Sequence, residues 1–157
     1  EKDEDIVSIG ALVKKLHTLF VLQGKGRRIR VSVNTVIPKP FTTLQWAPML
    51  KSGEINRKRK IIHSQIRSLK GVEFTQKNAK SEIIQAYLTL GGMRTGKALY
   101  ESIVENKPLK QSLRAQEIDL KWFHNQKQED EHFPWEIIQY ETSKSTLWKR
   151  YQKLVNP

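Results

Sequence analysis

Two prolines placed just after a strand-like segment constrain this chain more than any other feature. Apolar residues alternate with polar ones from Ile29 to Val33, which is the period of a β-strand with two different faces. Pro38 and Pro40 lack the backbone N–H that a strand uses and hold the residues before them in extended geometry. The sequence therefore predicts a strand that ends near Val36 and continues as a stiff, polar loop.

The loop combines polar side chains with two aromatic ones. Its candidate site residues, as contacts to a cofactor or substrate, are Asn34, Lys39, Phe41, Thr42, Gln45 and Trp46. A rigid loop of this composition is typical of those that line sites on α/β scaffolds, where the aromatic side chains wall a cavity and the polar ones contact the ligand. The alternative is that the aromatic pair only pins the loop to the core.

Helical periodicity covers most of the remaining chain. Apolar residues recur at helical spacing over residues 6–22, 52–70, 81–90, 95–107, 111–124 and 143–155, and residues 71–76 alternate as a short edge strand. These patterns predict an α+β fold that is mostly helical. The helix over 6–22 and the strand after it form one αβ unit, and a parallel strand normally has neighbours on both sides. No segment upstream of this unit supplies such a neighbour, so we expect the strand to oligomerise or to pair with polypeptide from elsewhere.

The charge balance points to anionic partners. Lys and Arg number 28 against 16 Asp and Glu, which gives a net charge of +12, and such an excess favours nucleic acid or phosphates. The run Arg57, Lys58, Arg59 and Lys60 is the candidate nucleic-acid contact, with RNA as the partner. Four consecutive residues surround a helix, however, so the alternative is a basic face that only meets solvent.

Two absences limit the chemistry that the sequence predicts. The chain has no cysteine, so it cannot itself form disulfides or hold an iron–sulfur cluster, and its histidines match no metal-ligand spacing. We predict no metal site. It has no apolar run long enough to cross a bilayer, and the acidic start EKDED differs from a secretory signal, so we expect a cytoplasmic protein that does not bind membranes.

The segment VSVNTVIPKPFTTLQWAPM resembles the last barrel strand of an uncharacterised family of radical S-adenosylmethionine (radical SAM) proteins, some of which carry a cobalamin-binding domain. The segments EIIQAYLTLGG, HFPWEII and SKSTLW follow in the order of landmarks in the C-terminal part of those proteins. The resemblance covers the chain from about Gly26 onward, and IPKPFTTLQW is its most specific part. Thr43 departs from the family pattern, which often has proline there.

The resemblance implies a C-terminal fragment of a radical SAM enzyme. Residues 1–50 would be the last helix, strand and Pro-rich loop of a partial (β/α) barrel, and residues 51–157 a helical C-terminal region. The upstream barrel of the same polypeptide would bind S-adenosylmethionine and a four-iron cluster through a CxxxCxxC motif, and reductive cleavage of the cofactor would give a 5′-deoxyadenosyl radical. This chain lacks those cysteines and would be inactive alone. The alternatives are a basic nucleic-acid-binding module and a structural or assembly domain, which could be a homo-oligomer.

Overall fold

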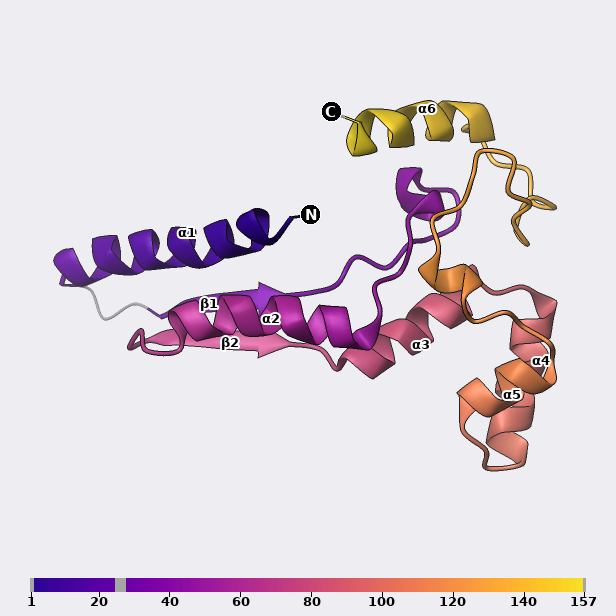
Figure 1. The fold of residues 1–157 in the computed structure, drawn as a ribbon, viewed down its shortest axis with the longest axis horizontal. Coiled ribbons are helices and arrows are strands. Elements are labelled where there is room, and N and C mark those ends of the chain that lie inside the picture. Colours follow the sequence, from indigo (N-terminus) through magenta and orange to yellow (C-terminus); the bar gives the residue numbers. More distant parts are fainter. Residues whose placement is uncertain (1, 25–27, 157) are drawn as a thin grey trace. The chain divides into compact units, whose positions relative to one another are not determined.

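The computed structural model describes residues 2–24 and 28–156, which form a mixture of helices and two strands (Figure 1). The helices are α1 (Asp3–Leu22), α2 (Ser52–Ile66), α3 (Ala79–Leu90), α4 (Met93–Val104), α5 (Leu109–Ala115) and α6 (Lys144–Val155). The strands are β1 (Ile29–Val33) and β2 (Val72–Gln76), and two short 3-10 helices are η1 (Thr43–Trp46) and η2 (Trp122–His124). The expected mixture of helix and strand, with helix predominating, is confirmed.

The chain divides into two compact units. Unit 1 contains the chain up to Thr35 together with Lys51–Ser81, and unit 2 contains Val36–Leu50 together with the chain from Glu82 onward. The Pro-rich loop therefore belongs to unit 2, although the strand before it and the helix after it belong to unit 1. The predicted functional division into residues 1–50 and 51–157 stays a prediction.

Unit 1 is built on a parallel pair of strands. β1 pairs with β2 in a register that places Val31 opposite Phe74, and Arg30 opposite Glu73 with an ion pair of 3.2 Å. α2 connects the two strands, as a parallel pair requires, and Gly71, at a φ of 81°, supplies the turn that leads into β2. The expectation that β1 has no partner within this chain is therefore wrong, because a short strand far along the sequence pairs with it.

The core of unit 1 joins the sheet to both of its long helices. Ile6 and Val13 of α1 and Ile62 and Ile66 of α2 are buried with Val31 of β1, and both helices run along the strands (Figure 1). These buried residues are part of the periodic apolar pattern of the sequence, and on each helix they lie on the face toward the core.

The two helices of unit 1 approach closely at a glycine of α1. A side chain at Gly10 would meet the amide group of Gln65, on α2, at 2.7 Å. Gly10 therefore permits this helix contact. α2 ends at Ile66, four residues before the predicted end at Lys70, since residues 67–70 form the turn toward β2.

Unit 2 has a separate core that is rich in aromatic side chains. Its buried members are Trp46, Tyr87, Leu90, Ala98, Leu113, Phe123, Phe133, Trp135, Leu147 and Tyr151. The helix predicted over residues 111–124 is wrong in its middle: α5 ends at Ala115, Glu117 adopts a φ of 55°, and η2 begins only at Trp122. A residue in the left-handed region interrupts a right-handed helix.

Candidate ligand-binding site

The Pro-rich loop is held in one conformation by its own hydrogen bonds. The hydroxyl of Thr42 donates to the carbonyl oxygen of Lys39 at 2.8 Å, and the backbone N–H of Phe41 donates to Oε1 of Gln45 at 3.1 Å. Phe41 has a φ of 57°, a conformation that costs a bulky residue on the order of 1–3 kcal/mol. Such strain persists only where the surroundings fix it, and it is concentrated at functional sites.

Two of the predicted loop residues line a cavity of about 190 Å³ in unit 2. We call it the aromatic cavity, and its wall includes Phe41, Gln45, Phe133, Trp135, Tyr140 and Lys144. η1 and the turn before it contribute one side, and the segment between η2 and α6 contributes the other. Phe41 and Gln45, predicted as ligand contacts, thus line a cavity, and their role as contacts stays a prediction. The segment 133–144 supplies wall residues that were not among the predicted site residues.

The walls of the aromatic cavity are two stacked pairs of rings. Phe41 and Tyr140 stack with ring centroids 4.6 Å apart and planes inclined by 24°. Phe133 and Trp135 stack at 4.6 Å with planes inclined by only 11°. The wall of this cavity is therefore largely aromatic.

Gln45 is the buried polar group of the aromatic cavity, with 3% of its surface exposed. Its Oε1 accepts hydrogen bonds from the backbone N–H of Phe41 at 3.1 Å and from Nε1 of Trp135 at 3.0 Å. Both partners are donors, so the orientation of the amide is determined by its neighbours. Among the described residues nothing accepts from its Nε2, which remains a donor for a ligand.

An ion pair lies at the rim of the aromatic cavity. Nζ of Lys144 donates to a carboxylate oxygen of Glu136 at 2.5 Å and to the carbonyl oxygen of Glu131 at 2.5 Å. Burial alone would raise the pKa of Glu136, but hydrogen bonds from Lys144 and the Phe133 backbone lower it below its ordinary value. Lys144 opens α6, whose N-cap is Ser143, one of the two serines (with Ser145) that the sequence offers for this role, and its Oγ accepts from the N–H of Thr146 at 3.2 Å.

The other predicted loop residues lie outside this wall. Lys39 and Thr42 are exposed, and Asn34 is exposed in unit 1. Trp46 is fully buried and packs against Trp148 and Tyr151 of α6, with ring centroids 5.2 and 5.9 Å away. Trp46 therefore anchors the loop to the core of unit 2 and does not contact the space of the cavity.

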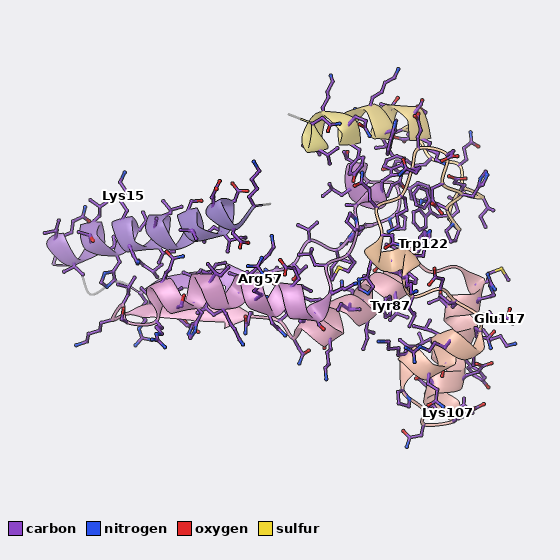
Figure 2. The ribbon with its side chains drawn as sticks, viewed as in Figure 1. Lys15, Arg57, Tyr87, Lys107, Glu117 and Trp122 are labelled. Atoms are coloured by element: carbon purple, nitrogen blue, oxygen red, sulfur yellow. The ribbon has the colours of Figure 1, made fainter. Side chains whose placement is uncertain are left out.

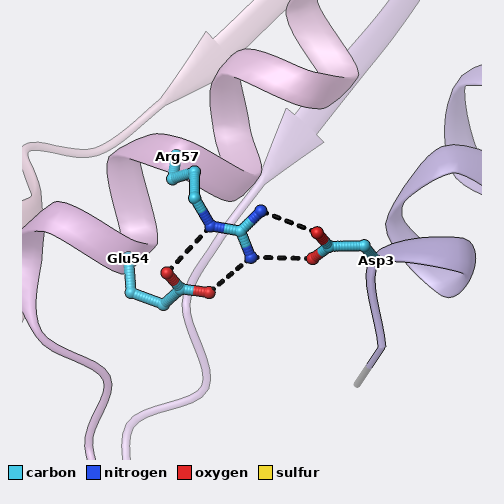
Figure 3. Close-up of polar contacts among 3 residues, drawn as sticks. All are labelled: Asp3, Glu54 and Arg57. Atoms are coloured by element: carbon cyan, nitrogen blue, oxygen red, sulfur yellow. Dashed lines mark hydrogen bonds and ion pairs between the residues drawn. The ribbon is translucent and has the colours of Figure 1, made fainter.

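The predicted nucleic-acid run is divided between an ion-pair cluster, a buried residue and more accessible positions. Arg57 donates to both oxygens of Asp3 at 2.7 Å and to Glu54 at 2.9 and 2.6 Å (Figure 3). The hydrogen bonds from Arg57 lower the pKa of both carboxyl groups below their ordinary values. Two carboxylates therefore compensate the charge of this guanidinium.

Arg59, the third residue of the run, is 4% exposed. Its Nη1 donates to the carbonyl oxygen of Lys77 at 2.8 Å and its Nη2 to the hydroxyl of Thr35 at 3.2 Å. These partners follow β2 and β1, so Arg59 ties together the carboxyl ends of both strands. Lys60 is exposed and Lys58 half-buried; the run does not form one continuous basic surface.

Lys127 is a buried charged residue in the polar stretch NQKQEDE, whose composition favours exposure. It is 2% exposed, and its Nζ has no hydrogen-bond acceptor among the described residues. The Nζ lies 4.6 Å from the ring centre of Trp122, which is labelled in Figure 2 and donates through Nε1 to Glu131 at 2.8 Å. Burial lowers the pKa of Lys127 to about 8, although Glu131 opposes that shift. No local pattern in NQKQEDE indicates this burial.

No group of three or more His, Cys, Asp or Glu side chains in the described ranges could hold a metal ion. His124 instead makes contacts within unit 2: its Nδ1 lies 2.8 Å from the carbonyl oxygen of Met49 and its Nε2 3.2 Å from the hydroxyl of Tyr87. No helix in the part of the chain that the structure describes is both long and apolar enough to cross a bilayer.

Comparisons with protein-family models, with curated proteins and with solved structures give no match to this chain.

Proposed function

We propose that this chain is the C-terminal part of a radical SAM enzyme, in which β1 and β2 are strands of a partial barrel and the Pro-rich loop lines the site. In this proposal the upstream polypeptide completes the barrel and carries the cluster and S-adenosylmethionine. Phe41 and Gln45 contact the ligand, and Trp46 holds the loop. Asn34, Lys39 and Thr42 are further polar contacts, made when the upstream part is present.

The observation that carries the proposal is the parallel pairing of β1 with β2 through α2, with the Pro-rich loop leaving the carboxyl end of β1. Sites of parallel α/β folds lie at the carboxyl ends of their strands. A parallel pair connected by a helix is the building unit of such folds, and in them it is nearly always part of a larger sheet. The sheet has two strands within the described residues.

The surface of α1 also supports a larger assembly. Ile9, Leu12, Leu16 and Leu19 are 37%, 58%, 37% and 48% exposed, and they form one stripe at helical spacing beside the buried face. Four leucine and isoleucine side chains in a row are an apolar surface that a partner would cover. The proposal assigns this cover to the upstream polypeptide of the barrel.

The cluster itself does not fit this chain. Its ligands would be cysteine thiolates, and the sequence contains no cysteine. The described residues contain no other group of metal ligands in its place. The proposal therefore assigns no step of the chemistry to residues of this chain beyond binding and orienting a ligand and excluding water.

The test uses the product of the natural reading frame that contains this chain. The frame is searched upstream for CxxxCxxC, and the purified protein is supplied with iron and sulfide without oxygen. We expect bound iron and the formation of 5′-deoxyadenosine from S-adenosylmethionine and a reductant. A frame without the cysteines, or a reconstituted protein that forms no 5′-deoxyadenosine, would contradict the proposal. In the active protein, Asn34→Ala and Lys39→Ala should weaken cofactor binding or turnover; unchanged values would remove those two roles.

The nucleic-acid alternative gains no specific support from the basic run. Arg57 is engaged by two carboxylates and Arg59 by backbone and hydroxyl oxygens, whereas Lys60 is exposed. If RNA binding depends on this run, affinity should fall steeply with salt and Lys60→Ala should reduce it.

A further inference from the structure

The size of the aromatic cavity limits its ligand to about one ring. Its volume is about 190 Å³, and a protein cavity of about 150 Å³ is known to hold a benzene molecule. A six-membered ring with small substituents therefore fits, whereas a fused ring system with a sugar attached would extend beyond the wall. The wall meets solvent at Tyr140, which is 50% exposed, so a substituent of the ring can leave the cavity there.

The walls select a planar ring. The four rings of the Phe41–Tyr140 and Phe133–Trp135 stacks all belong to the cavity wall. Base-on-aromatic stacking is sequence-tolerant because every base has a π-face, and it contributes strongly to the binding of single nucleotides. An aliphatic ligand of equal volume would not gain this interaction.

Gln45 selects the ligand by hydrogen bonding. Its Oε1 is occupied by the donors of Phe41 and Trp135, so the group it offers is the Nε2 donor. A buried donor favours a ligand with a carbonyl oxygen, because a ligand that presents its own N–H would leave both groups unpaired. The ring therefore carries a hydrogen-bond acceptor such as a carbonyl oxygen.

Lys144, the cation of the cavity wall, is paired with Glu136, and the other cations of α6 lie on the side of the helix away from Lys144. Lys144 and Leu147 at the start of the helix line the cavity, and Lys149, Arg150 and Lys153 farther along the same helix are exposed. A phosphate attached to the ring outside the cavity would therefore be attracted mainly by the net charge of +12 of the chain.

We propose that the aromatic cavity binds a pyrimidine base with ring carbonyls, as in uracil, carried by a free nucleotide or by single-stranded RNA. The inference rests on the proposed role of the Pro-rich loop as a site loop, but it concerns binding by this chain and needs no iron. The base stacks between the ring pairs, and Nε2 of Gln45 donates to one of its carbonyl oxygens.

The test is a calorimetric titration of the purified protein with uridine monophosphate, adenosine monophosphate and oligouridylate. We expect uridine monophosphate to bind about tenfold more tightly than adenosine monophosphate, because the fused rings of adenine are larger than the single ring that the cavity holds. Gln45→Glu keeps a carboxylate oxygen for the donors of Phe41 and Trp135 but replaces the Nε2 donor by an acceptor. This variant should weaken the binding of uridine monophosphate by about tenfold or more.

A second variant avoids the core. Tyr140→Ala removes a ring from the cavity wall at a half-exposed position outside the buried core. It should weaken the binding of the base severalfold by the loss of stacking. The matched control is Tyr100→Ala, since Tyr100 is 68% exposed on α4 and lies outside the cavity wall; binding should be unchanged.

The outcomes separate the sources of the base and the two proposals. The inference is supported if Gln45→Glu and Tyr140→Ala weaken binding and the protein binds both uridine monophosphate and oligouridylate. It is also supported if the protein binds oligouridylate alone and both variants weaken that binding, and this result identifies RNA as the source of the base. No binding, or salt-sensitive binding that neither variant changes, overturns the inference. If the longer protein forms no 5′-deoxyadenosine, the radical SAM assignment is wrong, but the result of this titration with the present chain does not change.

Discussion

Replacing the buried Lys127 by methionine should stabilise unit 2. Burial lowers the pKa of Lys127 from 10.5 to about 8, and one unit corresponds to about 1.4 kcal/mol, so keeping the amine charged in the folded state costs at most about 3.5 kcal/mol. The contact of its Nζ with the Trp122 ring, at 4.6 Å, offsets on the order of 0.5–1 kcal/mol of this cost. Lys127→Met removes the charge and keeps most of the volume, so we expect a gain of about 1–3 kcal/mol at neutral pH.

The pH dependence identifies the cause. Because the folded state has the lower pKa, the unfolded chain binds more protons between about pH 8 and pH 10.5, and the stability of the parent protein rises with pH through this window. The advantage of Lys127→Met should therefore be complete below pH 8 and shrink as the pH approaches 10.5. Above that value the amine is neutral in both states.

The assay is urea unfolding followed by tryptophan fluorescence at several pH values. All four tryptophans belong to unit 2, so the signal reports the unfolding of that unit. Lys121→Met is the matched control, since Lys121 is exposed a few residues earlier, and it should leave the midpoint unchanged. A loss of stability in Lys127→Met, or a gain that does not change between pH 7 and pH 10, would refute the reasoning.

Three further substitutions test the packing of the two units. Arg59→Met should destabilise unit 1 by about 2–4 kcal/mol, because it removes two hydrogen bonds of a buried cation at the strand ends; faster hydrogen exchange in β2 would show it, and exchange at the original rate would contradict it. Gly91→Ala should lower the melting temperature, because the new Cβ would lie 2.2 Å from Oγ1 of Thr95 and such overpacking costs about 1–3 kcal/mol. Gly96→Ala has nothing within 4 Å of the new Cβ and should raise stability by about 0.5–1 kcal/mol; equal melting temperatures for the two alanine variants would argue against the close approach of Gly91 to Thr95.

Local sequence patterns predicted much of the secondary structure and little of the long-range pairing. Helical periodicity identified the face of α2 that buries Ile62 and Ile66, since the spacing of apolar residues along one helix is a local property. The pairing of β1 with β2 is not local: the paired strands are separated by the loop and by α2, and no register signal connects their sequences. An isolated strand pattern therefore appeared to have no neighbour.

The same distinction explains the candidate site. Phe41 and Gln45 were predicted because the prolines fix a polar and aromatic loop, and that composition is visible in the sequence. Tyr140 and Lys144 could not be assigned to the cavity, because they meet the loop only through tertiary packing. Charged residues were the least predictable group: Arg59 and Lys127 stand in polar stretches, yet specific partners or an aromatic neighbour allow both to be buried.

Because the Pro-rich loop belongs to unit 2 but precedes most of that unit in the sequence, the two units can complete their folding at different stages of synthesis. All residues of unit 1 have been synthesised once Ser81 has left the ribosome. Trp46 of unit 2, however, packs against Trp148 and Tyr151, which are synthesised about a hundred residues later. During that interval a large aromatic side chain is exposed although unit 1 can already fold. Chaperones that recognise apolar segments should therefore associate with nascent chains truncated before α6, and release them when the last helix emerges.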